Sequence, residues 1–266
     1  MSLLLAAAAR FAERIKVNSI SRQVRDGRIF WIKRRRWFAR PMMACANRFF
    51  RLAGSPMRAL DDSAAWQRWE INCLHHLHGG EFQAFTEGPR AIATEEVPGV
   101  GLAFYLDAGT LTPAMAAAAG RELRRAHAFT VPPLRGLWSH GDSHAGNFVY
   151  EPKTDRARLI DFEVTHDPAT GAEERHADDL LVFLQDVIGR IARAAWLPTA
   201  RAFLEGYERP EILALLEQRL VVPRGIPQLW WAIRTASWPS AEIEQRLEEL
   251  RAILPPAAAM EARRQA

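Results

Sequence analysis

The strongest constraint on the folding of this chain lies between residues 140 and 163. The stretch begins His140-Gly-Asp-Ser-His-Ala-Gly-Asn147 and ends Leu159-Ile-Asp-Phe-Glu163. Two short apolar segments, at 147–150 and 157–162, flank a polar turn, and this pattern predicts a β-hairpin. Such a hairpin returns Asn147 and Asp161 to the same end of one ribbon, although 14 positions separate them.

Three oxygen-bearing side chains stand at this hairpin. Asp142 lies just upstream, in a loop interrupted by Gly141 and Gly146, while Asn147 and Asp161 occupy the end of the ribbon. Phosphoryl transfer needs a group that orients the attacking hydroxyl, and it needs oxygen ligands for magnesium. Any single aspartate would favour the alternative of a buried hairpin with polar ends, but the ordered set Asp, Asn, Asp favours a catalytic site.

The motif HGDxHxxN followed by IDFE resembles the protein-kinase-like phosphotransferases. The resemblance is to the branch with aminoglycoside phosphotransferases, choline kinases and bacterial lipopolysaccharide core sugar kinases. It implies an α+β, bilobal fold with a small, mostly antiparallel β N-lobe and a larger, mainly α-helical C-lobe. It also implies that Asp142 is the catalytic base and that Asn147 and Asp161 hold Mg²⁺ on ATP. It extends over about 20–190 and is dense only over 123–180.

A second hairpin is predicted near the start of the chain, with strands at 20–25 and 28–33 around Asp26-Gly27. The second strand ends in Lys33, which the resemblance makes the ATP-phosphate lysine; an edge-strand lysine is the alternative. Lysine is rare among the 35 basic residues, occurring only as Lys16, Lys33 and Lys153. No glycine-rich phosphate loop precedes Lys33, and the hairpin residues 23–28 are expected to take its place.

A helix is predicted at 62–78, ended by a glycine pair, and strands are predicted at 82–86 and 90–97. The resemblance implies that Glu70 on this helix pairs with Lys33, the alternative being an exposed glutamate. It also makes Glu96 and Val97 the hinge whose backbone binds adenine.

Further helices are predicted at 112–128 and 175–191, with mostly helical structure at 198–252 interrupted by prolines. The resemblance makes Asp179 a buried support of the catalytic loop, with helix capping as the alternative. His140 is expected to hold the loop backbone rather than act as a base.

Charge is distributed unevenly. Residues 1–60 contain 14 Lys and Arg but only two acidic residues. This block indicates an anionic partner: ATP, an anionic membrane, a phosphorylated lipid or sugar, or nucleic acid; a solvated basic surface is the alternative. Residues 34–62 interleave arginines with bulky apolar side chains, which suits a lipid surface, nucleic acid or a helix docked on the lobe.

Other properties narrow the class of protein. Two cysteines give no disulfide framework, and no apolar run reaches the roughly 18 residues of a membrane span. The N-terminus lacks the positive region of a secretory signal, so a cytoplasmic protein is expected, with peripheral contact at the inner face of an anionic membrane as a further possibility. The expected division is an N-lobe at 1–97, a C-lobe at 98–254 and a tail at 255–266.

The sequence therefore predicts an ATP- and Mg²⁺-dependent phosphotransferase. Its acceptor would be a hydroxyl of a small molecule, a sugar or a lipid-linked sugar such as the lipopolysaccharide core. The alternative is a non-catalytic kinase-like scaffold that binds a membrane or a partner through the basic N-terminal region. A protein kinase ranks lower, because HGDxH and DFE replace HRD and DFG. The sequence predicts neither the acceptor's identity nor the oligomeric state.

Overall fold

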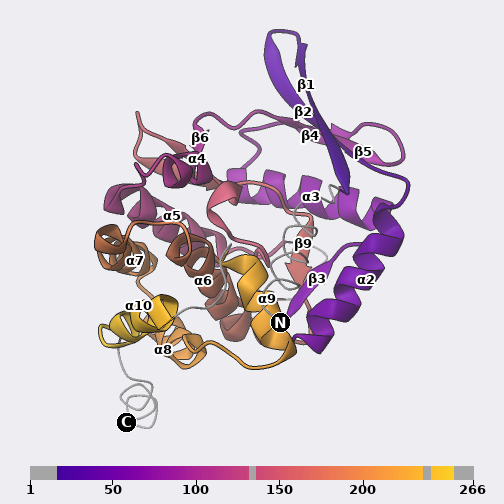
Figure 1. Cartoon of the computed structure of the whole chain (residues 1–266). Coiled ribbons are helices and arrows are strands. Elements are labelled where there is room, and N and C mark those ends of the chain that lie inside the picture. The colour runs from indigo at the N-terminus through magenta and orange to yellow at the C-terminus, as the bar shows by residue number, and fades with distance from the viewer. Residues whose placement is uncertain (1–16, 132–135, 236–240, 255–266) are drawn as a thin grey trace.

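The structure, a computed structural model, describes residues 17–131, 136–235 and 241–254. A small antiparallel sheet with one helix beside it lies against a larger, mainly helical part (Figure 1). The predicted α+β, two-lobed fold is therefore confirmed. Residues 1–16 of the expected N-lobe and the expected tail at 255–266 lie outside the described residues.

Four strands form the sheet of the small lobe, in the order β1-β2-β5-β4, with every neighbouring pair antiparallel. These strands are β1 Asn18–Arg25, β2 Arg28–Arg35, β5 Ala91–Glu95 and β4 Ala84–Thr86. Asp26 and Gly27 join β1 to β2 with positive φ angles of 48° and 76°, as a two-residue hairpin turn requires. The predicted N-terminal hairpin is confirmed.

Helix α3, Ser63–His78, packs against this sheet and agrees with the prediction for 62–78. It begins where Asp62 Oδ2 accepts a hydrogen bond from Ala65 N at 2.7 Å. It ends at Gly79, whose φ of 60° closes the last turn in the left-handed conformation. These local signals set both ends of the helix that carries Glu70.

The register of the β1–β2 hairpin corrects one expectation. Lys33 pairs with Ile20, near the start of β1, whereas the turn at Asp26-Gly27 lies at the opposite end of the ribbon. At about 3.3 Å per residue the turn is about 20 Å from Lys33, and the hairpin projects away from the rest of the molecule (Figure 1). The expectation that residues 23–28 cover the nucleotide phosphates is therefore wrong. The residues of β1 that do lie near Lys33 are Asn18, Ser19 and Ile20.

The large lobe consists of helices around one hydrophobic core, with a short three-stranded sheet of order β6-β7-β8 at its junction with the small lobe. The strands are β6 Val100–Gly101, β7 Phe148–Glu151 and β8 Arg156–Leu159, so the predicted hairpin at 147–162 is present. The helices are α4 Leu102–Asp107, α5 Pro113–Ala126, α6 Ala172–Ile188, α7 Arg193–Tyr207, α8 Pro210–Arg219, α9 Ile226–Arg234 and α10 Ala241–Arg251, with a 3₁₀ turn η1 at Ala145–Asn147.

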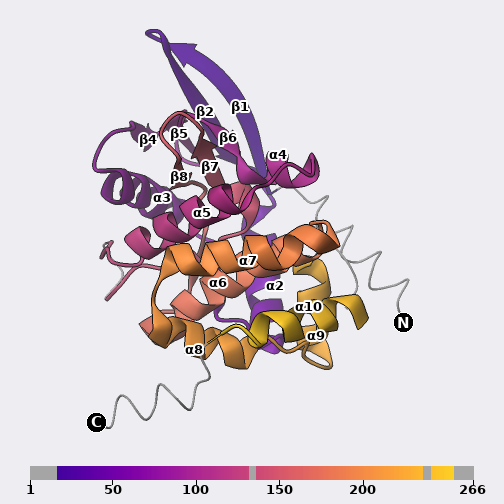
Figure 2. The same ribbon diagram turned by 90° about the vertical axis from the view of Figure 1, so that its left-hand side faces the viewer.

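Helices α5 and α7 run side by side and touch closely (Figure 2). A methyl group at Gly120 of α5 would overlap the carbonyl oxygen of Phe203. A methyl group at Gly206 of α7 would overlap the carbonyl oxygen of Ala117. The two glycines therefore set the distance between the helices.

Residues 34–62 include a helix that docks on the molecule. Helix α2, Ala39–Leu52, packs against β3, Met57–Ala59, which pairs with β9, Val164–His166. The inward side of α2 places Met43 and Phe50 in a small apolar cluster with Met57 and Trp230 of α9. No helix of the described residues is long and apolar enough to cross a bilayer.

Candidate active site

A buried lysine connects the two lobes. Lys33 Nζ of β2 donates to Glu70 Oε1 of α3 and to Asp161 Oδ1, which follows β8, at 2.6 Å each. Trp66 Nε1 donates to the other oxygen of Glu70, so both carboxylate oxygens are engaged. Burial opposes the charge on Lys33, but Asp161 and Glu70 outweigh it and raise the pKa of the lysine. Three residues from separate elements therefore meet at one point.

The two carboxylates respond to this cation in opposite ways. Burial raises the pKa of Glu70, and Lys33 only partly offsets it. Burial also disfavours the Asp161 carboxylate, but Lys33 outweighs burial and lowers the pKa of Asp161. Asp161 also has a φ of +63°, an uncommon backbone conformation for a residue other than glycine. The Asp161 side chain keeps 32% of its surface exposed, so an ionised carboxylate faces the opening.

The loop before β7 carries Asp142 beside this point. His140 Nε2 donates to the carbonyl of Ile160 at 3.1 Å, which ties the loop to the residue before Asp161. Ile160 N donates to the carbonyl of Asn147 at 2.9 Å, so Asn147 and Asp161 do lie at the same end of the hairpin. The Asp142 side chain is 36% exposed, and His144 Nε2 lies 3.9 Å from its Oδ2.

The side chain of Asn147 fits the role of a magnesium ligand. Its Nδ2 donates to the carbonyl of Asp142 at 2.8 Å, which fixes the amide and leaves Oδ1 as the ligand atom. Asp161 supplies an ionised carboxylate next to it along the hairpin end. An amide oxygen with one carboxylate, completed by phosphate oxygens and water, is the kind of set that Mg²⁺ takes in proteins.

Asp179 of α6 supports the loop at 140–147 from behind. Its Oδ2 accepts from His140 N at 2.7 Å and its Oδ1 accepts from Gly141 N at 2.8 Å. His127 Nε2 lies 3.0 Å from Oδ2, and Ser143 Oγ donates to the Asp179 carbonyl at 2.6 Å. Burial disfavours this carboxylate, but nearby histidines outweigh burial and hold its pKa well below its usual range. Asp179 is engaged with the loop rather than with a helix N-terminus.

Asp186 is a second support that the sequence analysis missed. Its Oδ2 accepts from Ala145 N at 2.9 Å, at the turn that leads into Asn147. Asp186 lies two helical turns after Asp179 on α6, so both carboxylates face the same loop. This spacing is the sequence signal that would have identified it.

A cavity of about 280 Å³ opens between the lobes beside Lys33. Its lining residues include Lys33, Glu70, Val97 and Asp161, together with Ile20, Trp31, Leu74, Thr94, Glu95, Val149, Ile160 and Phe162. Most of this lining is apolar; Lys33, Glu70 and Asp161 meet at one end, and Glu95 lies apart from them, three positions further along β5 than the residue that pairs with Lys33.

The two residues expected to form the hinge, Glu96 and Val97, differ in their position. Val97 lines the cavity, whereas Glu96 does not. The Glu96 side chain instead accepts a hydrogen bond from Trp31 Nε1 at 3.1 Å, and its backbone N–H donates to the carbonyl of Ile29 at 2.8 Å. Trp31 is a further lining residue that the sequence analysis missed, although it lies two positions before Lys33 on the same face of β2.

Comparison with known proteins gives similarities of structure only. No protein-family model matches the sequence, and no curated protein matches it. An ethanolamine kinase of Plasmodium vivax is similar at 11% identity and a TM-score of 0.45, covering 92% of this chain and 85% of that one.

Two aminoglycoside-type enzymes are also similar. A type VIII aminoglycoside-3'-phosphotransferase has 14% identity and a TM-score of 0.44, covering 91% of this chain and 99% of its own. A spectinomycin phosphotransferase, solved with ADP and spectinomycin, has 13% identity and a TM-score of 0.42, covering 92% and 88%. These similarities concern the overall architecture alone. By their names, these three proteins are one kinase and two phosphotransferases.

Proposed function

We propose that the protein is an ATP-dependent phosphotransferase that moves the γ-phosphate to a hydroxyl group. The observation that carries this proposal is the double contact of Lys33 with Glu70 and Asp161 at the charged end of the interlobe cavity. A buried lysine held between two carboxylates has few structural uses, because desolvating three charges is costly. A triphosphate bound at this point would replace Asp161 as a partner of the Lys33 ammonium, while the contact with Glu70 would keep Lys33 in place.

The apolar part of the cavity suits the base of the nucleotide. Trp31 and Ile20 on one side, and Val149 and Ile160 on the other, offer surfaces for a flat ring. The N–H of Glu96 is already used within the sheet, so the hinge contact to adenine falls to the backbone of Val97. We place the boundary between the lobes, at 97/98, at this hinge.

Asn147 and Asp161 would hold Mg²⁺, which neutralises charge on the phosphates when it is bound. Asp142 is exposed enough to accept a hydrogen bond from the acceptor hydroxyl and to align it for attack. His140 and Asp179 act through the backbone of the loop and set the position of Asp142. In this proposal most of the rate acceleration comes from positioning and charge stabilisation.

The acceptor we propose is a small molecule, a sugar or a lipid-linked sugar, of which the lipopolysaccharide core is one example. The basic region at residues 34–58 supports an anionic or lipid-linked acceptor at the cytoplasmic face of a membrane. Labelled ATP given with fractionated cell extract would show which fraction receives phosphate, and would separate these acceptor classes.

Calorimetry with ATP and Mg²⁺ tests the nucleotide site directly. Wild-type protein should bind, and Lys33→Met should lose binding by at least tenfold, because the variant offers no cation to the phosphates. Lys153→Met, which removes an exposed lysine on the β7–β8 turn, is the matched control and should bind normally. Asp142→Asn should keep nucleotide binding and lose phosphate transfer. Failure of the wild-type protein to bind any nucleotide would contradict the proposal and favour the scaffold alternative.

A further inference from the structure

The outward side of α2 combines arginines and apolar side chains on one continuous surface. Helical periodicity places Arg40, Arg48 and Arg51 in one row, with Leu52 in the row beside it. We call this surface the α2 face; its exposed residues are Arg40, Pro41, Ala44, Cys45, Arg48, Arg51 and Leu52. The helix lies on the outside of the molecule, beside β3 (Figure 1).

The arginines around this surface have no carboxylate partners among the described residues. This holds for the three arginines of the α2 face and also for Arg34, Arg36 and Arg58, which flank it. No acidic residue occurs in the sequence between Asp26 and Asp61. Asp61 and Asp167 line a groove with Arg48, Arg51 and Arg58 but form no ion pair with them, so the six arginines leave this surface with a net positive charge among the described residues.

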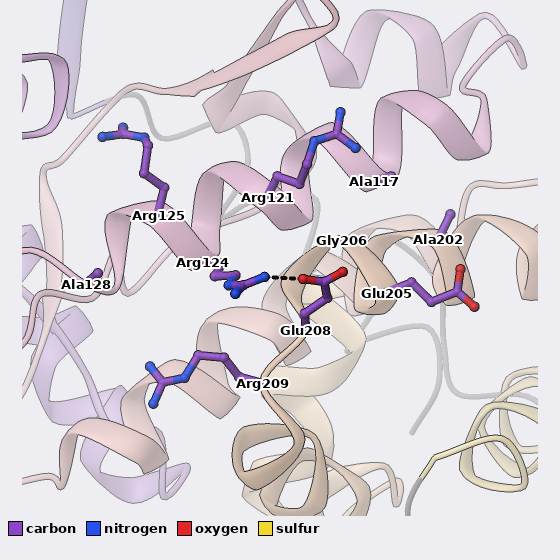
Figure 3. Close-up of a pocket in the computed structure, with 10 residues that line it drawn as sticks. All are labelled: Ala117, Arg121, Arg124, Arg125, Ala128, Ala202, Glu205, Gly206, Glu208 and Arg209. Carbon is purple, nitrogen blue, oxygen red and sulfur yellow. Dashed lines mark hydrogen bonds and ion pairs between the residues drawn. The ribbon is translucent and has the colours of Figure 1, made fainter.

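A second arginine-rich region serves as a comparison, because its arginines are paired with carboxylates. A groove of about 780 Å³ between α5 and α7 is lined by Arg121, Arg124, Arg125 and Arg209 (Figure 3). Each of these four is paired with a carboxylate, for example Arg124 with Glu208. Carboxylates of the protein neutralise these four arginines, so the groove has no excess positive charge that could attract a partner. The α2 face differs because its charge is left open to solvent.

The apolar side chains of this region favour a lipid surface over a nucleic acid. Trp37, just before α2, is 81% exposed, and Leu52 at the end of the helix is 67% exposed. Phe49 and Phe50, the aromatic residues of α2 that could stack on bases, pack inward against Trp230. An exposed indole and an exposed leucine beside arginines suit a helix that lies in a membrane interface, where tryptophan prefers the headgroup region.

We infer that the α2 face docks the protein on the surface of an anionic lipid bilayer. The arginines would meet lipid phosphates, and Trp37 and Leu52 would enter the headgroup region. Docking of this kind is peripheral and reversible, because it uses charge and little buried apolar area.

The position of α2 relative to the catalytic loop limits what this docking implies for the proposed reaction. Trp230 of α9 packs on α2, and Arg234 of the same helix donates to the carbonyl of Gly141 at 3.4 Å, next to Asp142. Because α9 packs on the inward side of α2 and borders the catalytic loop, a membrane on the outward side of α2 would be separated from that loop by α2 and α9. The docking therefore does not rest on the proposed function, and it leaves the class of acceptor open.

Vesicle flotation of the full chain, without nucleotide, tests the docking separately from catalysis. Wild-type protein should float with vesicles of phosphatidylcholine mixed with phosphatidylglycerol, and should remain unbound with phosphatidylcholine alone or at high salt. The variant Arg40→Gln/Arg48→Gln/Arg51→Gln should partition roughly a hundredfold more weakly, because each arginine at an anionic surface contributes a factor of about five. Trp37→Ala should weaken binding without changing its salt dependence.

The matched control removes three other exposed arginines that have no ion pair among the described residues, as Arg68→Gln/Arg156→Gln/Arg201→Gln. It carries the same change in net charge and should float like the wild type. Equal loss in both triple variants would show a general charge effect and overturn the inference. So would unchanged flotation of the α2 variant, or binding of single-stranded RNA in preference to anionic vesicles. Vesicle binding without nucleotide binding would keep the docking surface and refute the proposed function.

Discussion

The replacement Asp179→Asn tests whether one buried carboxylate holds the catalytic loop in place. Asp179 Oδ1 accepts from Gly141 N, and Oδ2 accepts from His140 N, with His127 Nε2 as a second neighbour. An asparagine keeps the shape but must replace one of these oxygens by an NH₂ group. Whichever oxygen it replaces, at least one backbone N–H of the loop then faces another donor.

The expected cost follows from counting these bonds. Losing one hydrogen bond to a charged acceptor costs about 1.5–3 kcal/mol, and leaving a buried donor without an acceptor costs about 1–3 kcal/mol more. We therefore expect the free energy of unfolding to fall by about 3–5 kcal/mol. At about 2–4 °C per kcal/mol for a chain of this size, Tm should fall by about 10 °C.

Thermal and urea denaturation of the wild type and Asp179→Asn measure this difference. The control is Asp178→Asn, one position earlier on α6, where the carboxylate lies near His166 and Arg219 but contacts no loop N–H. It should cost about 1 kcal/mol. Nucleotide binding should survive in Asp179→Asn while phosphate transfer falls, since Lys33 is untouched and Asp142 is displaced. A loss of stability below about 1 kcal/mol would refute the reasoning, because it would mean that the buried bonds can be exchanged freely.

Two further predictions concern the cavity and the core. Trp31→Ala should weaken Mg-ATP binding about tenfold in calorimetry, because stacking of an aromatic ring on a base contributes about 1–3 kcal/mol; equal affinities would place the base elsewhere. His176 is buried against His127, with ring centroids 3.8 Å apart, and burial lowers its pKa to about 3. As the pH drops, the His176 imidazole therefore becomes protonated in the unfolded chain at a higher pH than in the folded chain. The free energy of unfolding should fall between about pH 6.5 and pH 3, by up to about 1.4 kcal/mol per pH unit. Urea denaturation between pH 7 and 5 should show a shallower slope for His176→Gln, and identical slopes would exclude His176 as the source.

Local patterns of the sequence were enough for the elements that carry the site. The turn at Asp26-Gly27, the cap at Asp62 and the polar turn between β7 and β8 each depend on a few neighbouring residues. The resemblance then implied the pairing of Lys33 with Glu70, and the structure brings these two residues together across 37 positions.

Other features depended on how distant elements meet. The direction in which the β1–β2 hairpin projects follows from its pairing with β5, so the position of residues 23–28 was misjudged. Trp31 reaches Glu96 only because β2 pairs with β5, which ends just before Glu96. Asp186 reaches Ala145 only because α6 lies beneath the loop. Periodicity indicates which face a residue occupies, but not which partner covers that face.

The contact of α5 with α7 makes the catalytic loop sensitive to a change far from it. Gly120 and Gly206 allow the two backbones to touch, and His127, just after α5, joins Tyr207 at the end of α7 to Asp179. A single methyl group at either glycine would overlap a backbone oxygen of the other helix and push the two helices apart. This displacement would move the imidazole of His127, and with it the Asp179 carboxylate that holds the loop of Asp142. Screens for impaired variants should therefore find alanine at Gly120 or Gly206 among the changes that slow the reaction without contacting a substrate.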